Sequence, residues 1–131
     1  MPLSITTFYA GLNGLILLIL AFRVGRARAR TKILIGTGGD AELERAIRAH
    51  ANAAEYVPIV LILIGALELS GASHLLLHGL GIALTLGRVL HGWGLSHASG
   101  LSLGRQAGAM LTGIARAVAS VAAIVAGFGV I

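Results

Sequence analysis

Five polar residues recur at helical spacing within a short segment of the chain: Arg45, Arg48, Asn52, Glu55 and Tyr56. At 100° per residue, they fall within an arc of about 100° on one face of a helix. Guanidinium groups bind carboxylates through paired hydrogen bonds, and a carboxylate binds an ammonium group. The pattern therefore predicts a site for a ligand that carries both anionic groups and a cation.

The simplest alternative to a binding site is that these charged residues form a helix face exposed to water. That alternative accounts for Arg45, near the start of the segment. It does not account for Glu55, because an apolar run follows at residues 57–61. An unpaired charge below the surface of a membrane costs roughly 3 kcal/mol. We therefore expect Glu55 to be paired with Arg48, with Arg88, or with the cation of a ligand.

The composition indicates a membrane protein. Of 131 residues, 56% are hydrophobic and only 11% are charged, whereas a soluble domain carries about 25% charged residues. The net charge of +5 does not favour nucleic acid, because five cations cluster within residues 23–32 and aromatic residues make up only 5% of the chain. The chain has no cysteine, so any thiol chemistry must use a thiol that arrives as substrate.

Four apolar segments are long enough to cross a membrane. Residues 2–22, for example, contain no charged side chain, and a hydrocarbon core takes about 20 helical residues. We predict an all-α fold, an integral membrane four-helix bundle that forms one domain over residues 1–131. Its helices are expected at about residues 3–24, 41–69, 74–97 and 103–130.

Short polar or glycine-rich segments separate these helices. Residues 31–40 are predicted to be a loop, with Asp40 placed to cap the second helix. Ser99-Gly100 is expected to break the chain between the third and fourth helices. The third helix is rich in glycines, which let membrane helices approach closely; they are Gly79, Gly81, Gly87, Gly92 and Gly94.

The distribution of basic residues predicts the orientation. The connection between the first two helices holds five Lys and Arg residues, the next turn holds none, and the last is followed by Arg105. By the positive-inside rule, the first and third connections are cytoplasmic and both termini lie on the far side.

The fourth helix repeats the polar pattern, with Arg105, Thr112 and Arg116 on one face. An interhelical salt bridge explains Arg116 as well as a binding site does. His74 and His78 lie one turn apart without an evident third ligand, so we predict no metal site. Glu68, near the far-side boundary, is expected simply to reach water.

The run from Glu42 to Pro58, ELERAIRAHANAAEYVP, resembles the signature of the MAPEG family, the membrane-associated proteins in eicosanoid and glutathione metabolism. The shared pattern is E-x-E-R-x-x-R-A-(H/Q)-x-N-x-x-E-(Y)-x-P. The run Arg88-Val89-Leu90-His91 and the isolated Arg116 are also similar to the family. The resemblance therefore covers essentially the whole chain.

This resemblance implies a homotrimer that binds glutathione near the cytoplasmic side, between neighbouring subunits. It also implies a multi-pass protein of the bacterial inner membrane that acts on a lipophilic small molecule from the bilayer. Arg28 matches a basic residue that ends the first helix. Carried over, the residues expected to bind glutathione are Arg28, Arg48, Asn52, Glu55, Tyr56, Arg88 and His91.

Three positions depart from the leukotriene synthase branch of the family. His91 and Leu95 stand where that branch has tyrosines, and an ungapped alignment places Ser102 where it has the arginine that stabilises the thiolate. Arg105 is the nearest cation, and we predict it to be the catalytic residue. A nearby guanidinium lowers the pKa of a thiol from its ordinary value near 8.5 and raises the reactive fraction.

Three functions remain open at this point. The leading hypothesis is a glutathione-dependent transferase or peroxidase that acts on lipophilic electrophiles. The first alternative is a non-enzymatic membrane protein that binds lipid or glutathione, which the missing tyrosines favour. The second is a small proton-coupled transporter, which the intramembrane Glu55 favours and the adjacent Arg48 disfavours.

Overall fold

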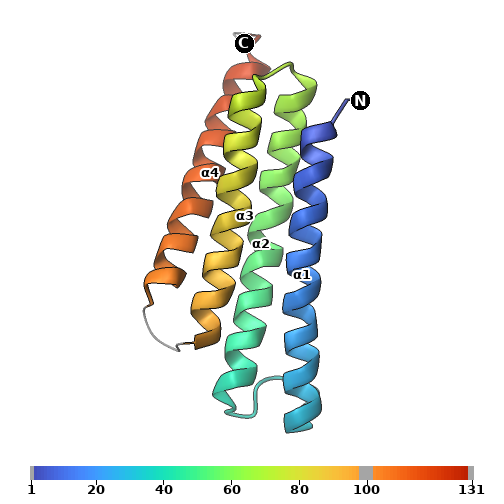
Figure 1. The fold of residues 1–131 in the computed structure, drawn as a ribbon, viewed down its shortest axis with the longest axis vertical. Coiled ribbons are helices and arrows are strands. Elements are labelled where there is room, and N and C mark those ends of the chain that lie inside the picture. The colour runs from blue at the N-terminus through green and yellow to red at the C-terminus, as the bar shows by residue number, and fades with distance from the viewer. Residues whose placement is uncertain (1, 98–101, 130–131) are drawn as a thin grey trace.

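The computed structural model describes residues 2–97 and 102–129, which form an antiparallel bundle of α-helices (Figure 1). In chain order these are α1 (Ser4–Thr31), α2 (Ala41–Leu69), α3 (His74–His97) and α4 (Leu103–Gly127). All four are long and apolar enough to cross a membrane. The prediction of an all-α protein with four membrane-spanning helices is therefore confirmed.

The ends of two helices differ from those expected. α1 continues to Thr31 instead of ending near residue 24. Its last turns are rich in alanine and arginine, which favour a helix without being apolar, so hydropathy alone ends the segment too early. α4 extends to Gly127; residue 130 and the expected break at Ser99-Gly100 lie outside the described residues.

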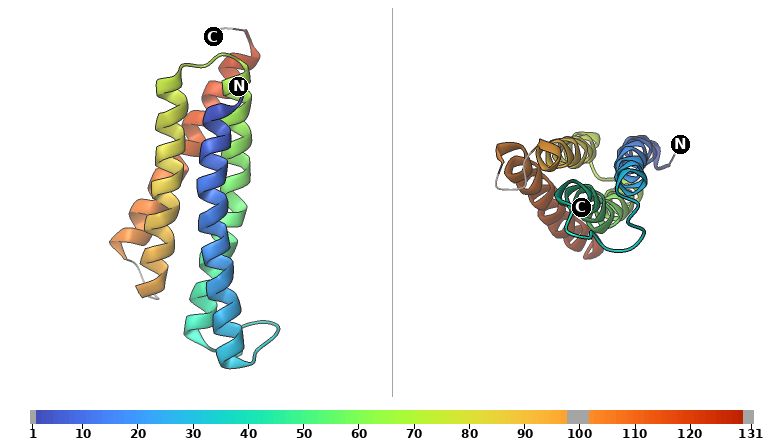
Figure 2. Two further views of the ribbon diagram at one scale, coloured as in Figure 1. Left: turned by 45° about the vertical axis from the view of Figure 1, so that its right-hand side comes forward. Right: turned by 90° about the horizontal axis from the view of Figure 1, so that it is seen from below.

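The start of α1 and the end of α4 lie at one end of the bundle, and the connection between α1 and α2 lies at the other (Figures 1 and 2). We call the latter the basic end, because the arginines of residues 23–30 approach it. Figure 2 shows α3 and α4 diverging from α1 and α2 toward this end. The polar features described below lie mostly there.

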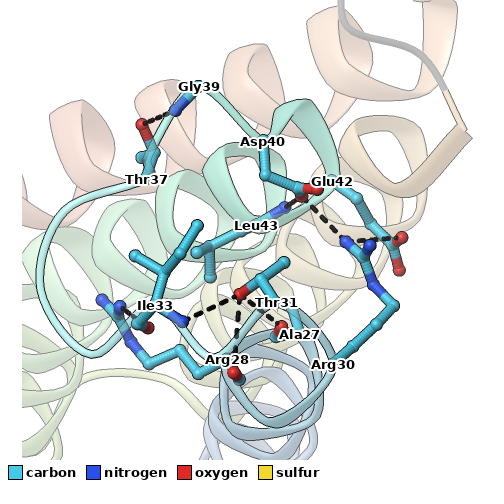
Figure 3. A network of polar contacts seen from close by, with 10 residues as sticks. All are labelled: Ala27, Arg28, Arg30, Thr31, Ile33, Thr37, Gly39, Asp40, Glu42 and Leu43. Atoms are coloured by element: carbon cyan, nitrogen blue, oxygen red, sulfur yellow. Dashed lines mark hydrogen bonds and ion pairs between the residues drawn. The ribbon is translucent and has the colours of Figure 1, made fainter.

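A capped turn fixes α1 against α2 at the basic end (Figure 3). The Asp40 carboxylate accepts a hydrogen bond from the backbone N–H of Leu43 (2.8 Å) and one from Arg30 (2.8 Å). Arg30 also pairs with Glu42 at 3.2 Å. The Leu43 N–H, followed by Arg30, holds the pKa of Asp40 below its ordinary value of 3.8. The predicted capping role of Asp40 is confirmed.

A second carboxylate joins the same two helices at the opposite end. Glu68, near the end of α2, accepts hydrogen bonds from the backbone N–H groups of Ile5 (2.9 Å) and Thr6 (2.8 Å) and from the Thr6 hydroxyl (2.6 Å). The start of a helix has unpaired N–H groups and a partial positive charge. The expectation that Glu68 simply reaches water is therefore wrong, because this side chain caps α1.

Glycines bring α3 and α4 into direct backbone contact. A Cβ atom added to Gly94 of α3 would collide with the backbone nitrogen of Arg105. One added to Gly108 of α4 would lie 2.5 Å from the Gly87 carbonyl oxygen. Side chains at these positions would push the helices apart, so the glycines set the distance across which Arg88 reaches α4.

A polar network joins α1 to α3 in the half of the bundle nearer the termini. The Tyr9 hydroxyl and the His78 Nδ1 atom are 3.0 Å apart, and the Tyr9 ring occupies space that a side chain at Gly81 would fill. Asn13, fully buried, donates hydrogen bonds to the Tyr9 carbonyl and to the Thr85 hydroxyl, each 2.9 Å long. These contacts hold α1 in a fixed register on α3.

Candidate functional site

Arg88 lies at the centre of the candidate site, 2% exposed between three helices. Its Nε and Nη2 atoms donate hydrogen bonds to the Thr112 hydroxyl of α4, at 3.0 and 2.6 Å. Its Nη1 atom donates to the Asn52 side-chain oxygen of α2 at 2.6 Å, and Nη2 also reaches the Gly108 carbonyl at 3.4 Å. One guanidinium group therefore ties α2, α3 and α4 together.

All of these partners are neutral oxygens. Within residues 2–97 and 102–129, no carboxylate forms an ion pair with Arg88. Burying a charge is costly unless hydrogen bonds offset the loss of water, and the partners of Arg88 supply them. The positive charge remains uncompensated, so the surroundings of Arg88 favour an anion.

Tyr56 links this buried arginine to a second one. The guanidinium carbon of Arg88 lies 5.6 Å from the centre of the Tyr56 ring, and that of Arg116 lies 5.5 Å from it. Both distances allow a cation–π interaction. In the part of the chain that the structure describes, Arg116 forms no salt bridge, so its contact with Tyr56 replaces the interhelical ion pair considered from the sequence.

A cavity of about 260 Å³ lies at the basic end, where the start of α2 faces the end of α3 and the start of α4. It is lined by Ala41, Glu44, Arg45, Arg48, Leu95 and Arg105. The structure therefore brings Arg48 and Arg105, predicted from different helices, to one cavity. Ser102, which an ungapped alignment places at the thiolate-stabilising position, instead caps α4 by accepting a hydrogen bond from the Arg105 N–H at 3.2 Å.

Glu55 is not paired with Arg48 or Arg88, so of the three partners expected for it only the cation of a ligand stays a prediction. The side chains of Glu55 and Arg48 are both exposed, and no ion pair among the described residues includes either. The direction of the side chain explains this result: Glu55 lies at the outer edge of the polar face of α2, whereas Arg88 packs against Asn52, about 60° further round the helix.

Glu55 also lies far from both ends of the bundle, although its side chain is exposed. It is the middle residue of α2, and the contacts of Arg30 with Glu42 and of Thr6 with Glu68 set the antiparallel pairing of α1 and α2. This pairing places Glu55 about 6 to 9 Å further from the basic end than Arg23, at 1.5 Å rise per residue. An exposed carboxylate at that depth needs a partner from outside this chain.

The remaining predicted residues are placed differently. Arg28 donates a hydrogen bond to the Ile33 carbonyl at 2.9 Å (Figure 3). It donates another to the Gly36 carbonyl at 3.2 Å, so it holds the connection between α1 and α2. It does not join the cluster around Arg88. His91, 5% exposed, packs where α3 crosses Gly108 of α4.

Thr112 is a site residue to which the sequence analysis gave no role. It accepts two hydrogen bonds from Arg88 and donates one to the Gly108 carbonyl at 2.9 Å. Its signal was present in the sequence, because Thr112 shares one helix face with Arg105 and Arg116. A hydroxyl on an otherwise cationic face could have been recognised as a buried acceptor for an arginine of another helix.

Comparison with known proteins identifies the family. The sequence profile of the MAPEG family matches residues 6–125, which extend into all four helices. The chain belongs to the MAPEG family. This MAPEG protein is similar to inner membrane protein YecN of Escherichia coli strain K12, with 40% identity over 93 residues that cover 71% of each chain. YecN of strain CFT073, serotype O6:H1, matches to the same extent.

The family, the relatives and the helices agree on location. Four membrane-length helices and similarity to a named inner membrane protein make this MAPEG protein a multi-pass inner membrane protein. Its polar cluster around Arg88 and its cavity at the basic end are therefore features of a membrane-embedded bundle.

Proposed function

We propose that this MAPEG protein binds glutathione at the cavity between α2, α3 and α4. The observation that carries the proposal is that Arg45, Arg48 and Arg105 line this one cavity. Glutathione has two carboxylates for guanidinium groups and one ammonium group for a carboxylate such as Glu55. Asn52 and Tyr56 lie on the same face of α2 and add polar contacts, and Arg88 behind them adds positive potential.

We further propose that a homotrimer completes the site. The cavity of about 260 Å³ is smaller than the 300 to 1,000 Å³ typical of ligand pockets, so walls from a second subunit would enlarge and close it. Arg48, Glu55 and Arg116 are all exposed on the side where α2 meets α4. A neighbouring subunit there would shield these charges from lipid. The number of subunits follows from the family resemblance.

Catalysis would use Arg105 to stabilise the glutathione thiolate. A few per cent of a free thiol is ionised at neutral pH, and a guanidinium group beside the sulfur increases this fraction. The thiol proton passes to water at the basic end. The thiolate then forms a carbon–sulfur bond with an electrophilic lipophile, which loses a leaving group or opens a strained ring. With a peroxide, the sulfur would take the terminal oxygen, and the O–O bond would break to release an alcohol.

A second candidate function is binding without catalysis. Leu95 lines the cavity at a position where the leukotriene branch has a tyrosine, so no hydroxyl from this position faces the ligand. His91 is buried against Gly108 and does not line the cavity. These two features favour a protein that holds glutathione or a lipid without activating it. The transporter alternative is disfavoured because Arg48 lies on the same face of α2 as Glu55, whereas a site for a transported cation needs a carboxylate without an adjacent arginine.

Calorimetric titration with glutathione in detergent tests the proposal. The wild-type protein is expected to bind saturably, and Arg48→Ala is expected to weaken binding at least tenfold, because one charged hydrogen-bonding group contributes about 1.5 kcal/mol or more. Lys32→Ala is the matched control, because it removes one positive charge from the exposed connection beyond the cavity. Equal binding by wild type and Arg48→Ala would contradict the proposed site.

We propose that the basic end faces the cytoplasm, as the positive-inside rule predicts. The absence of native cysteine allows single-cysteine labelling in intact cells. Leu34→Cys, in the exposed connection between α1 and α2, should resist a membrane-impermeant maleimide, and Ser70→Cys, at the opposite end, should react. The reverse labelling pattern would invert the proposed orientation.

A further inference from the structure

An apolar groove runs between α1 and α3, away from the exposed Arg48 and Glu55 side chains of α2. Its volume is about 450 Å³, and the side chains of Ile16, Ile19, Val89 and Trp93 line most of it. Arg23 also lines this groove. It is the first charged residue after the apolar stretch of α1, so it lies where the helix leaves the hydrocarbon core. The groove wall is therefore mostly apolar, with Arg88 also lining it and Arg23 at its basic end.

A second cavity begins at that arginine. It lies between α1 and α2, has a volume of about 520 Å³, and is lined by four arginines and one glutamate. The arginines are Arg23, Arg26, Arg30 and Arg45, and the glutamate is Glu42. Asp40 pairs with Arg30 beside this wall, so the arginines outnumber the nearby carboxylates by two, which favours an anion with several acceptor oxygens, such as a phosphate.

The two cavities share Arg23, so together they have the shape and polarity of an amphiphile. An anionic head would lie among the arginines, and a hydrocarbon chain would extend along α1 toward the middle of the membrane. Arginine side chains commonly combine an apolar stem with a charged end at this depth. Basic pockets between transmembrane helices bind lipid phosphates in the same manner.

The rim of the groove indicates that its occupant comes from the bilayer. Ile19, Val89 and Trp93 are 60%, 49% and 62% exposed, respectively. They continue an apolar outer surface on α1 and α3 that contrasts with the exposed charges of Arg48 and Glu55 on α2. Apolar side chains facing outward at membrane depth contact lipid, whereas exposed charges need protein or ligand.

We infer that the joined cavities form a binding site for an anionic phospholipid. Its phosphate group lies between Arg23 and Arg26, and one acyl chain lies along Ile16, Ile19 and Val89. Trp93 lies beside that chain, as expected of an aromatic side chain near the membrane interface. We infer that this site is separate from the proposed glutathione site, although two residues belong to both: Arg45 lines the phosphate cavity and the glutathione cavity, and Arg88, which supports the glutathione cavity, also lines the groove.

Trp93 provides a direct readout, because it is the only tryptophan in the chain and it lines the groove. The purified protein is placed in nanodiscs of phosphatidylcholine that contain a minority of lipid with brominated acyl chains, which quench tryptophan fluorescence on contact. Brominated phosphatidylglycerol is expected to reach half-maximal quenching at a concentration about fivefold or more below that of brominated phosphatidylcholine. The reason is that each basic residue near the membrane surface raises the affinity for an anionic lipid by about this factor.

Two alanine variants, Arg26→Ala and Arg23→Ala, test whether these arginines bind the lipid phosphate. Arg26 is exposed, so its substitution should leave folding intact; it is expected to lower the preference for phosphatidylglycerol about fivefold. Lys32→Ala, with the same loss of charge outside the cavity, should keep the full preference. Equal quenching by the two brominated lipids in the wild-type protein would overturn the inference. So would a preference unchanged in both arginine variants.

Two competitors define the ligand further. Glycerol phosphate, which has a head group but no acyl chain, should leave the quenching unchanged at millimolar concentration, because the groove contributes part of the binding. Relief of quenching by glycerol phosphate would show a site for free phosphate esters and overturn the lipid assignment. Saturating glutathione should also have no effect; relief by glutathione would assign these arginines to the glutathione site and overturn the inference of a separate site.

Discussion

Replacing Thr112 by valine should reveal how strongly the buried arginine depends on its acceptor. Thr112 is fully buried, and its hydroxyl accepts hydrogen bonds from Arg88 at 3.0 and 2.6 Å. Valine keeps nearly the same volume but removes this acceptor. Among the described residues, Arg88 would retain two hydrogen-bond acceptors, Asn52 and the more distant Gly108 carbonyl, besides its contact with the Tyr56 ring. A hydrogen bond to a charged group contributes about 1.5 to 3 kcal/mol, so the free energy of unfolding should fall by about 3 kcal/mol.

A matched variant separates the effect of charge from the loss of any buried hydroxyl. Thr85 accepts a hydrogen bond from Asn13 at 2.9 Å and donates one to the Gly81 carbonyl at 2.8 Å, all between neutral groups. Thr85→Val should therefore cost only about 1 kcal/mol. Thr112→Ser, which keeps the hydroxyl, should restore most of the stability lost in Thr112→Val.

Reversible unfolding by sodium dodecyl sulfate in mixed micelles, followed by circular dichroism, measures these differences. The expected order of destabilisation is Thr112→Val above Thr85→Val, with Thr112→Ser close to wild type. The reasoning would be refuted if Thr112→Val cost no more than Thr85→Val, because the hydroxyl would then not support a buried charge. It would equally be refuted if Thr112→Ser were as unstable as Thr112→Val, because packing of the methyl group would then explain the loss.

Three other perturbations follow from the fold. Glu68→Gln should weaken the cap of α1, lower stability by about 1 kcal/mol and speed hydrogen exchange in its first turn; unchanged exchange would argue against the cap. Asp40 has a lowered pKa, so its contribution to stability is complete above pH 3.8 and is lost as the pH falls below this value; Asp40→Asn should remove that loss in thermal unfolding scans, and an identical acid profile would contradict it. Gly108→Ala should separate α3 from α4 and sharply lower the unfolding temperature, whereas Gly113→Ala, with no atom within 4 Å of the added Cβ, should have little effect; equal effects would exclude backbone contact as the cause.

The number and type of helices could be predicted from the sequence because membrane-spanning length and apolar composition are local properties. Asp40 was likewise predictable, since a cap depends on residues three positions apart. The end of α1 was not, because the arginines after residue 22 interrupt the apolar run without interrupting the helix. Hydropathy therefore marks the membrane boundary near Arg23 and not the end of the helix.

The polar face of α2 was predicted as one unit, but the structure divides it. Asn52 and Tyr56 contact Arg88, while Arg48 and Glu55 are exposed. An arc of about 100° is wide enough to extend from the bundle interior to its surface. Which edge faces inward depends on the register of α3. That register is set by Gly87 and Gly94 of α3, which pack against α4, and by Tyr9 of α1, which packs against Gly81 of α3. Helical periodicity within α2 carries no information about those contacts.

The family resemblance could not place Arg28. Its position in the family pattern predicts a ligand contact, but within this chain its guanidinium holds the carbonyls of Ile33 and Gly36. Among the described residues, Arg28 does not line the proposed glutathione cavity. The role of Arg28 toward glutathione thus stays a prediction that depends on assembly.

The assignment of glutathione to the cavity is tested most directly by titrating the purified protein with glutathione while recording thiolate absorbance in the ultraviolet. The wild-type protein should give a saturable increase in absorbance. Arg105→Ala should still bind glutathione but give no thiolate signal, and Arg48→Ala should give neither at the same concentrations. Binding without any thiolate signal in the wild-type protein would remove the catalytic role and leave a binding protein. An absence of glutathione binding to the wild-type protein would contradict the central claim itself.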